Sequence, residues 1–173
     1  MNDHAAEKSP SVTTRFTRGA EKTSRLVHER CLAQLDVADL HYIALYRDNE
    51  LQFRIDVLAH PQLALYFRRS TPSMRRDEYE KIGRRFGYLT YQWNSNLRDV
   101  ESGVLIRLVF DVEMGAIYYH RIAEDQHLIG VTLAQRKVNV TDAKLRRLVD
   151  TIRTDMGLHP IVELEEVVEQ RDE

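Results

Sequence analysis

The stretch from Val104 to Leu133 constrains the fold of this chain more than any other, because it reads throughout as consecutive β-strands. Residues 104–112 alternate between apolar side chains and a mixed set, which is typical of a strand with one buried face. A Met-Gly pair ends that run, and residues 116–122 and 127–133 follow as two more segments rich in Ile, Val, Tyr and Thr. The polar residues 123–126 between them suit a turn. The stretch therefore predicts three antiparallel strands in a row, and the last two form a hairpin.

Two further strands and two helices are predicted around that stretch. Residues 21–35 carry apolar side chains every four residues, which is the spacing of an amphipathic helix. Residues 40–46 and 51–58 are strand-like, and the Asp-Asn pair between them suits a tight turn. A last helix is expected to start at Thr141 as its N-cap and to stop at Gly157.

The segment after Thr71 allows two interpretations. Threonine followed by proline is a typical helix start, and apolar residues then recur three or four apart over residues 74–98. This spacing predicts one long amphipathic helix, although Gly83 and Gly87 each cost about 1 kcal/mol in a helix. The alternative is a helix that stops at Gly87, followed by a strand over residues 88–93. We favour the long helix because more positions match its period.

Composition predicts one soluble domain with a tail at each end. The chain has 173 residues, of which 43% are hydrophobic and 30% charged, and its formal net charge of −2 gives no global reason to expect nucleic-acid binding. We expect a flexible arm over residues 1–20, a single domain over 21–159 and an acidic tail over 160–173. The single cysteine, Cys31, excludes an internal disulfide, and no apolar run is long enough to cross a bilayer. The expected location is the cytoplasm.

No pattern in the sequence declares a catalytic or metal site. The chain lacks a nucleophile elbow, a phosphate loop and a redox dithiol, and Cys31 lies on an apolar helix stripe. With a two-residue turn in the last hairpin, His120 and His127 would point to the same face, but two imidazoles fall short of the three or four ligands that zinc requires. We therefore predict no catalytic residue, no metal and no cofactor, and the sequence weighs against an enzyme.

The order of elements carries a family resemblance. The segments VLIRLVFDVE, AIYYHRIAEDQHLIGVTL and TDAKLRRLVDTIR, with the helices and strands before them, give the order α-β-β-α-β-β-β-α over about residues 21–157. This order resembles the roadblock type of profilin-like domain, a family related to dynein light chains and bacterial GTPase-activating partners. The resemblance implies an α+β fold, with a five-stranded antiparallel sheet and helices on both faces. It also implies a non-enzymatic regulatory protein that forms homodimers and has a protein partner, such as a small GTPase or a signalling complex.

Arginines are concentrated around the start of the long helix. They are Arg68, Arg69, Arg75, Arg76, Arg84 and Arg85. One interpretation is a solvated helix face. The other is a binding surface for an anionic partner, since the forked guanidinium is well suited to such contacts. The acidic tail could cover this cluster until a partner competes for it.

Aromatic residues in the same helix and the strand that follows predict a homodimer interface. The candidates are Tyr88, Tyr91, Trp93, Val104 and Ile106, with Tyr66 and Phe67 as further aromatic residues that could add to it. An apolar strand at the edge of a sheet would offer unpaired backbone groups to a second copy of the chain. In the alternative, the chain is a monomer, the strand is central and the aromatic residues belong to the core.

Two other functions stay open from the sequence. A small-molecule sensor should contain a closed apolar cavity, and an export or assembly chaperone should expose an apolar groove. Neither nucleic acid nor membrane insertion is expected.

Overall fold

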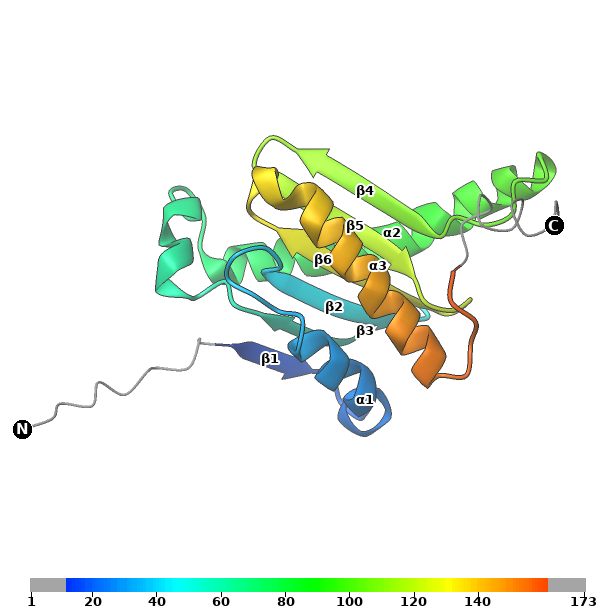
Figure 1. Cartoon of the computed structure of the whole chain (residues 1–173), viewed down its shortest axis with the longest axis horizontal. Helices are drawn as coiled ribbons and strands as arrows, with labels where there is room; N and C mark the ends of the chain where they lie inside the picture. Colours follow the sequence, from blue (N-terminus) through cyan, green and yellow to red (C-terminus); the bar gives the residue numbers. More distant parts are fainter. Residues whose placement is uncertain (1–11, 162–173) are drawn as a thin grey trace, which may run out of the picture.

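The computed structural model describes residues 12–161 as one antiparallel sheet with helices on both faces (Figure 1). The strands are β1 (Thr13–Phe16), β2 (Tyr42–Arg47), β3 (Glu50–Asp56), β4 (Arg107–Val112), β5 (Gly115–Arg121) and β6 (Gln126–Thr132). They lie in the order β1-β3-β2-β6-β5-β4. Helices α1 (Ala20–Leu32) and α3 (Val138–Asp155) cover one face, and α2 (Pro72–Asp99) crosses the other. Short 3₁₀ helices lie at Pro61–Tyr66 (η1) and Gln135–Lys137 (η2). The predicted α+β class is confirmed.

Within residues 12–161 the sheet has six strands, so the prediction of five was wrong. The additional strand, β1, lies within the segment expected to be an arm. It pairs with β3 from Thr13 opposite Asp56 to Phe16 opposite Phe53, and Phe16 packs against the core on the α1 side. A short polar strand of this kind is stabilised by its backbone ladder and a single apolar anchor, which composition does not reveal. Residues 1–11 of the expected arm lie outside the described residues.

Two cores lie on the two faces of the sheet. The core under α1 and α3 includes Cys31, Ile43, Phe53, Tyr118, Leu128 and Leu145. The core under α2 includes Tyr42, Tyr46, Leu51, Phe86, Tyr119 and Ile129. Strand β2 is buried on both faces because its neighbours β3 and β6 are paired and both of its faces are covered. The apolar run YIALY is what a strand in this central position requires.

Helix α2 is continuous from Pro72 to Asp99, so the predicted long helix is confirmed and the strand over residues 88–93 is excluded. The Thr71 side chain caps it by accepting a hydrogen bond from the Met74 backbone N–H at 3.2 Å. Gly83 is required where the helix crosses the sheet. A Cβ built there would lie 2.5 Å from the Tyr46 ring, and one at Gly87 would overlap the Asn49 side chain. Close packing therefore explains two glycines that helix propensity alone disfavours.

Helix α3 begins at Val138, so the prediction that Thr141 caps it was wrong. Thr141 is fully buried in the first turn, and its hydroxyl donates to the Asp39 carbonyl at 3.2 Å. Lys144 forms an ion pair with the Asp39 carboxylate at 2.6 Å. The polar groups of this turn therefore attach α3 to the loop that precedes β2. Within residues 12–161, no helix has the length and apolar composition needed to span a bilayer.

Candidate functional site

Strand β4 lies at one edge of the sheet, beside β5 (Figure 1). Two contacts place helix α2 along this edge. The Phe86 ring lies 5.1 Å from the Phe110 ring, and the Leu105 backbone N–H donates to the Asn94 side chain at 2.7 Å. The helix and the edge strand therefore run beside each other in opposite directions. The interpretation in which this strand is central is excluded.

One side of α2 carries exposed apolar side chains next to the exposed apolar residues of β4. Leu89 and Trp93 follow Phe86 at spacings of three and four residues, so all three lie on the same side of the helix. Leu89 is 37% exposed and Trp93 is 36% exposed, and on β4 Phe110 is 41% exposed. We call Leu89, Trp93 and Phe110, with Val112 at the end of the strand, the β4–α2 surface.

The charged residues of β4 point away from this surface. Arg107 forms an ion pair with Asp142 of α3 at 3.6 Å, and Asp111 accepts a hydrogen bond from Gln135 of η2. Both partners lie on the α3 side of the sheet. The charges that would discourage pairing of this edge are therefore bound within the chain, and the α2 side of β4 is apolar.

The structure separates the residues that the sequence predicted for a dimer interface. Trp93 lies on the β4 side of α2, whereas Tyr88 and Tyr91 are each two residues from a position on that side and point elsewhere. They are 66% and 80% exposed. Val104 and Ile106 precede β4, and Ile106 is 42% exposed. Leu89 and Phe110 were missed, although the three-and-four spacing from Phe86 to Trp93 is a signal that could have found Leu89.

The predicted arginine cluster divides into internal and exposed members. Arg75 donates to the Tyr66 carbonyl at 2.7 Å and lies over the Phe67 ring, so these three residues close the η1 loop onto α2. Arg76 is paired with a buried carboxylate described below. The exposed members are Arg68, Arg69, Arg84 and Arg85. The acidic tail that was expected to cover the cluster lies outside the described residues.

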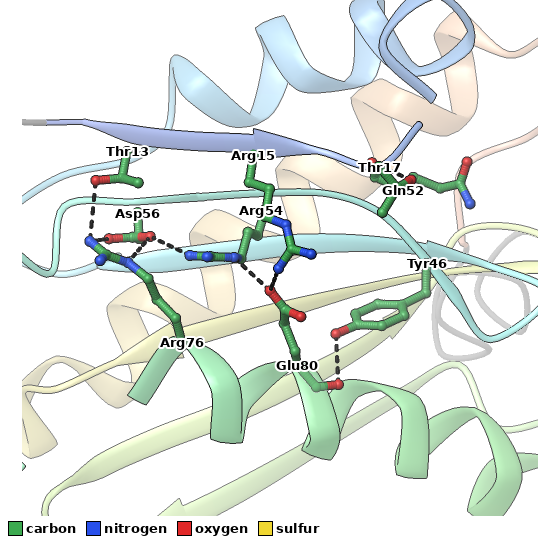
Figure 2. A network of polar contacts seen from close by, with 9 residues as sticks. All are labelled: Thr13, Arg15, Thr17, Tyr46, Gln52, Arg54, Asp56, Arg76 and Glu80. Carbon is green, nitrogen blue, oxygen red and sulfur yellow. Dashed lines mark hydrogen bonds and ion pairs between the residues drawn. The ribbon is translucent and has the colours of Figure 1, made fainter. Parts of the chain in front are cut away.

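A chain of paired charges, buried except for Arg15, fixes α2 to β3 and β1 (Figure 2). Asp56, whose side chain is fully buried, accepts two hydrogen bonds from Arg76 at 2.8 and 2.9 Å. Arg54 lies between the two carboxylates, 3.5 Å from Asp56 and 2.6 Å from Glu80. Arg15 of β1 reaches Glu80 at 3.1 Å. Because each carboxylate meets two guanidinium groups, this network compensates the cost of burying charge.

The same region holds α2 through its backbone. The Tyr46 hydroxyl donates to the Glu80 carbonyl at 3.0 Å, and the His127 ring donates to the Gly83 carbonyl at 3.0 Å. The Tyr46 and His127 rings stack with their centroids 4.9 Å apart. The middle of α2 is therefore fixed in rotation, which determines the side of the helix that carries Trp93. This network could not be predicted from the sequence. Its charged residues have the pattern of solvated side chains, and only the fold brings them together.

His120 and His127 lie on opposite faces of the sheet, so the prediction of a shared face was wrong. The hairpin pairs Arg121 with His127 and His120 with Leu128. A two-residue turn would have paired His127 with Ile122 instead. This shift of one residue moves one histidine to the other face. The described residues contain no group of three or more His, Cys, Asp or Glu side chains placed to hold a metal.

Burial determines the ionisation of these side chains. Burial lowers the pKa of His127 to about 4, although its hydrogen bond to Gly83 acts in the opposite direction. Burial, with Arg107 and Arg146 nearby, lowers the pKa of His120 to about 3. Both imidazoles are therefore neutral at pH 7. Burial raises the pKa of the Cys31 thiol far above neutral pH, as expected for a core residue rather than a nucleophile.

Comparison with solved structures identifies proteins of the same fold. A structure of MglB with a tetrameric arrangement covers 85% of this chain and 96% of its own, with 11% identity and a TM-score of 0.53. The gliding protein MglB from Thermus thermophilus gives the same values. A Roadblock/LC7 domain from Streptomyces avermitilis covers 68% of this chain and 86% of its own, with 12% identity and a TM-score of 0.47.

No protein-family model and no curated protein matches the sequence. At this level of identity, the structural likeness shows the fold alone. The roadblock-type fold that the sequence resemblance implied is confirmed.

Proposed function

We propose that this protein is a non-enzymatic regulatory module that forms a homodimer through the β4–α2 surface and binds a protein partner. The observation that carries the proposal is the combination of an open strand edge with an apolar helix side next to it. An edge strand offers unpaired backbone donors and acceptors, and a second copy of β4 satisfies them across a two-fold axis.

The two parts of the surface have different roles in the proposed dimer. Antiparallel pairing of β4 with its symmetry mate joins the two sheets, and its backbone hydrogen bonds set the register. Leu89 and Trp93 then pack against the α2 helix of the partner, which removes the most apolar exposed part of the helix from water. Val104 and Ile106, at the start of the edge, extend this contact. An interface of this kind buries on the order of 2,000 Å² in total.

Sedimentation equilibrium on two matched variants tests the dimer. Trp93→Glu places a charge on the β4 side of α2, whereas Tyr91→Glu places the same charge two residues away on a different side. If Trp93 loses about 90 Å² of exposed surface in each protomer, its burial contributes about 4 kcal/mol to the dimer, or about a thousandfold in Kd. We expect a dimeric wild type, a dimeric Tyr91→Glu variant and a folded monomer for Trp93→Glu. A monomeric wild type, or equal weakening by both variants, would refute the interface.

For the partner, we propose a small GTPase with an anionic contact surface. The resemblance to roadblock domains supports the class of partner, and the exposed Arg68, Arg69, Arg84 and Arg85 support the charge. Arg75 and Arg76 contribute by holding the η1 loop and α2 in place, since their guanidinium groups are bound within the chain.

Nucleotide-dependent affinity capture, followed by binding measurements, tests the partner. We expect a GTPase to be retained in one nucleotide state, and Arg84→Glu combined with Arg85→Glu to slow its association and reduce the salt dependence. A matched charge reversal on α1, Lys22→Glu with Arg25→Glu, should leave the association rate unchanged. Equal effects of the two pairs would show that net charge, and not this surface, controls binding.

A further inference from the structure

The hydrogen-bond pattern of β4 determines which of its backbone groups face the open edge of the sheet. In an antiparallel pair, residues alternate between those whose N–H and C=O groups bond to the neighbouring strand and those whose groups point away from it. The Arg121 backbone N–H donates to the Ile106 carbonyl at 2.9 Å, and β4 continues from there in regular register with β5. The even-numbered residues of β4 therefore bond to β5. Arg107, Val109 and Asp111 direct their N–H and C=O groups to the open edge.

This open edge is limited at both ends by the chain itself. At its start, Leu105 would continue the outward series, but its N–H donates to the side-chain oxygen of Asn94 in α2 at 2.7 Å. At its other end, residues 113–114 form the turn to β5, so Glu113 does not continue the strand. Within residues 12–161, three outward positions of β4 are therefore left to bond to an added strand.

We infer that two copies of β4 pair in one register, with the two-fold axis at Val109, and that Asn94 excludes the nearest alternative. The inference rests on the proposed dimer and specifies how its two strands meet. In this register Val109 lies opposite Val109 of the second copy, and Arg107 of each copy lies opposite Asp111 of the other. All three outward positions of both strands are then hydrogen-bonded.

A shift of the axis to Leu108 loses one of these contacts. Two hydrogen-bonded pairs would remain, and the next pair would place Asp111 opposite Leu105. That pair needs the Leu105 N–H, which is already bound to Asn94. Asn94 therefore makes this register poorer in hydrogen bonds than the one with its axis at Val109.

The other shifts are disfavoured by the turn and by charge. With the axis at Phe110, Arg107 would lie opposite Glu113, which belongs to the turn and not to the strand. With the axis at Arg107 or at Asp111, that residue would lie opposite its own copy, and like charges directly opposite each other are destabilising. In the inferred register, the charges that face each other across the axis have opposite signs.

The side chains of β4 are compatible with the inferred register. Those on the α2 side are apolar, so they pack in any register and do not select one. On the α3 side, Arg107 stays paired with Asp142 and Asp111 stays bonded to Gln135, because the ladder uses only backbone groups. The selection therefore comes from the backbone groups and from Asn94.

Disulfide trapping of the full chain tests the register. Pairing at Val109 places the two Val109 Cα atoms about 5.5 Å apart, within the range of a disulfide. The two Leu108 or the two Phe110 Cα atoms would be diagonal neighbours, about 7–8 Å apart. Under mild oxidation, we expect Val109→Cys to form a covalent dimer at least tenfold faster than Leu108→Cys or Phe110→Cys. The wild type, whose Cys31 is fully buried, is the control and should form none.

An isotope-filtered NOE measurement on mixed labelled and unlabelled wild-type chains tests the same register without a substitution. Leu108 of one copy and Phe110 of the other would form a pair without hydrogen bonds, whose Cα atoms are about 4.5 Å apart. We expect an intermolecular NOE between their Hα protons. An NOE from Phe110 to Ile106 in its place would indicate an axis at Leu108 and overturn the inference.

The role of Asn94 is tested by adding Asn94→Ala to Leu108→Cys. The freed Leu105 N–H completes the ladder of the register with its axis at Leu108, so trapping at position 108 should become at least threefold faster. Ser95→Ala, at the exposed neighbouring position of α2, is the matched control and should leave the rate unchanged. Equal rates with Asn94→Ala and Ser95→Ala would overturn the role of Asn94.

Failure of the register and failure of the dimer give different results. A wild type that dimerises in sedimentation equilibrium, but is trapped fastest at position 108 or 110 or at none of the three positions, overturns the register and leaves the proposed dimer in place. A monomeric wild type without trapping at any position overturns both.

Discussion

Acidification should destabilise this protein, because His127 is buried in its neutral form. The loss should begin at a higher pH than the one at which the carboxylates are protonated. The pKa of His127 is about 4 in the folded protein, lowered chiefly by burial, against 6.5 for the free side chain. At a pH between these two pKa values, the unfolded chain therefore binds a proton that the folded chain does not bind. The resulting stability is complete above pH 6.5 and is lost as the pH falls toward 4.

The magnitude follows from the difference between these two pKa values. A gap of about 2.5 pH units at 1.36 kcal/mol each gives about 3 kcal/mol, lost at about 1.4 kcal/mol per pH unit. His120 adds a loss in the same direction, since its pKa of about 3 is also depressed. Arg107 and Arg146 lower the pKa of His120 further, whereas Asp142 at 3.7 Å favours the imidazolium. His127 is therefore the clearer of the two to measure.

Urea unfolding at pH 7.0, 6.0 and 5.0 measures this dependence directly. The matched variant is His127→Gln, whose amide can donate to the Gly83 carbonyl but does not titrate. It should be less stable than the wild type at pH 7 because the stacking on Tyr46 is reduced. As the pH falls, however, its free energy of unfolding should decrease by about 1.4 kcal/mol less per pH unit than that of the wild type. Identical slopes for the two proteins, or an NMR titration that places the pKa of His127 near 6.5, would refute the reasoning.

Two substitutions test how α2 is held on the sheet. Gly83→Ala should destabilise the protein by about 1–3 kcal/mol despite the gain in helix propensity, because its Cβ would lie 2.5 Å from the buried Tyr46 ring. In thermal unfolding, most of this loss should vanish in a Tyr46→Ala background, and a stabilised single variant would contradict the close packing. Asp56→Asn should cost about 3 kcal/mol in urea unfolding, since it leaves Arg54 and Arg76 buried without their shared charge. The control Glu78→Gln removes an exposed ion pair and should leave the melting temperature unchanged, so equal effects would contradict a role for burial.

The sequence was sufficient to predict most of the elements, because their patterns are local. The alternation of apolar residues over 104–112 predicted β4. Over residues 74–98, apolar residues spaced three and four apart predicted a helix despite the β-forming aromatic residues of α2. The threonine cap at Thr71 followed from the identity of one side chain and its successor. The edge position of β4 could also be predicted from the sequence, since the strand has few charged residues.

Features that depend on register or on distant partners could not be predicted. The hairpin turn differs by one residue from the expected one, and that difference placed His120 and His127 on opposite faces. Strand β1 has no apolar period, and it forms because β3 offers a free edge. Arg76 could not be distinguished from Arg84 in the sequence, because only the fold brings Asp56 to one of them.

The internal contacts of α2 also explain how the β4–α2 surface is presented. Asp56 and Glu80 fix the first half of the helix through arginines, and Gly83 allows its middle to lie against Tyr46. Farther along, the Asn94 side chain receives the Leu105 backbone N–H and ties the helix to the segment that leads into β4. The helix side and the strand edge are therefore parts of one rigid unit. If the proposed dimer forms, the partner strand would meet Trp93 already in position, so association would not need to order the helix first.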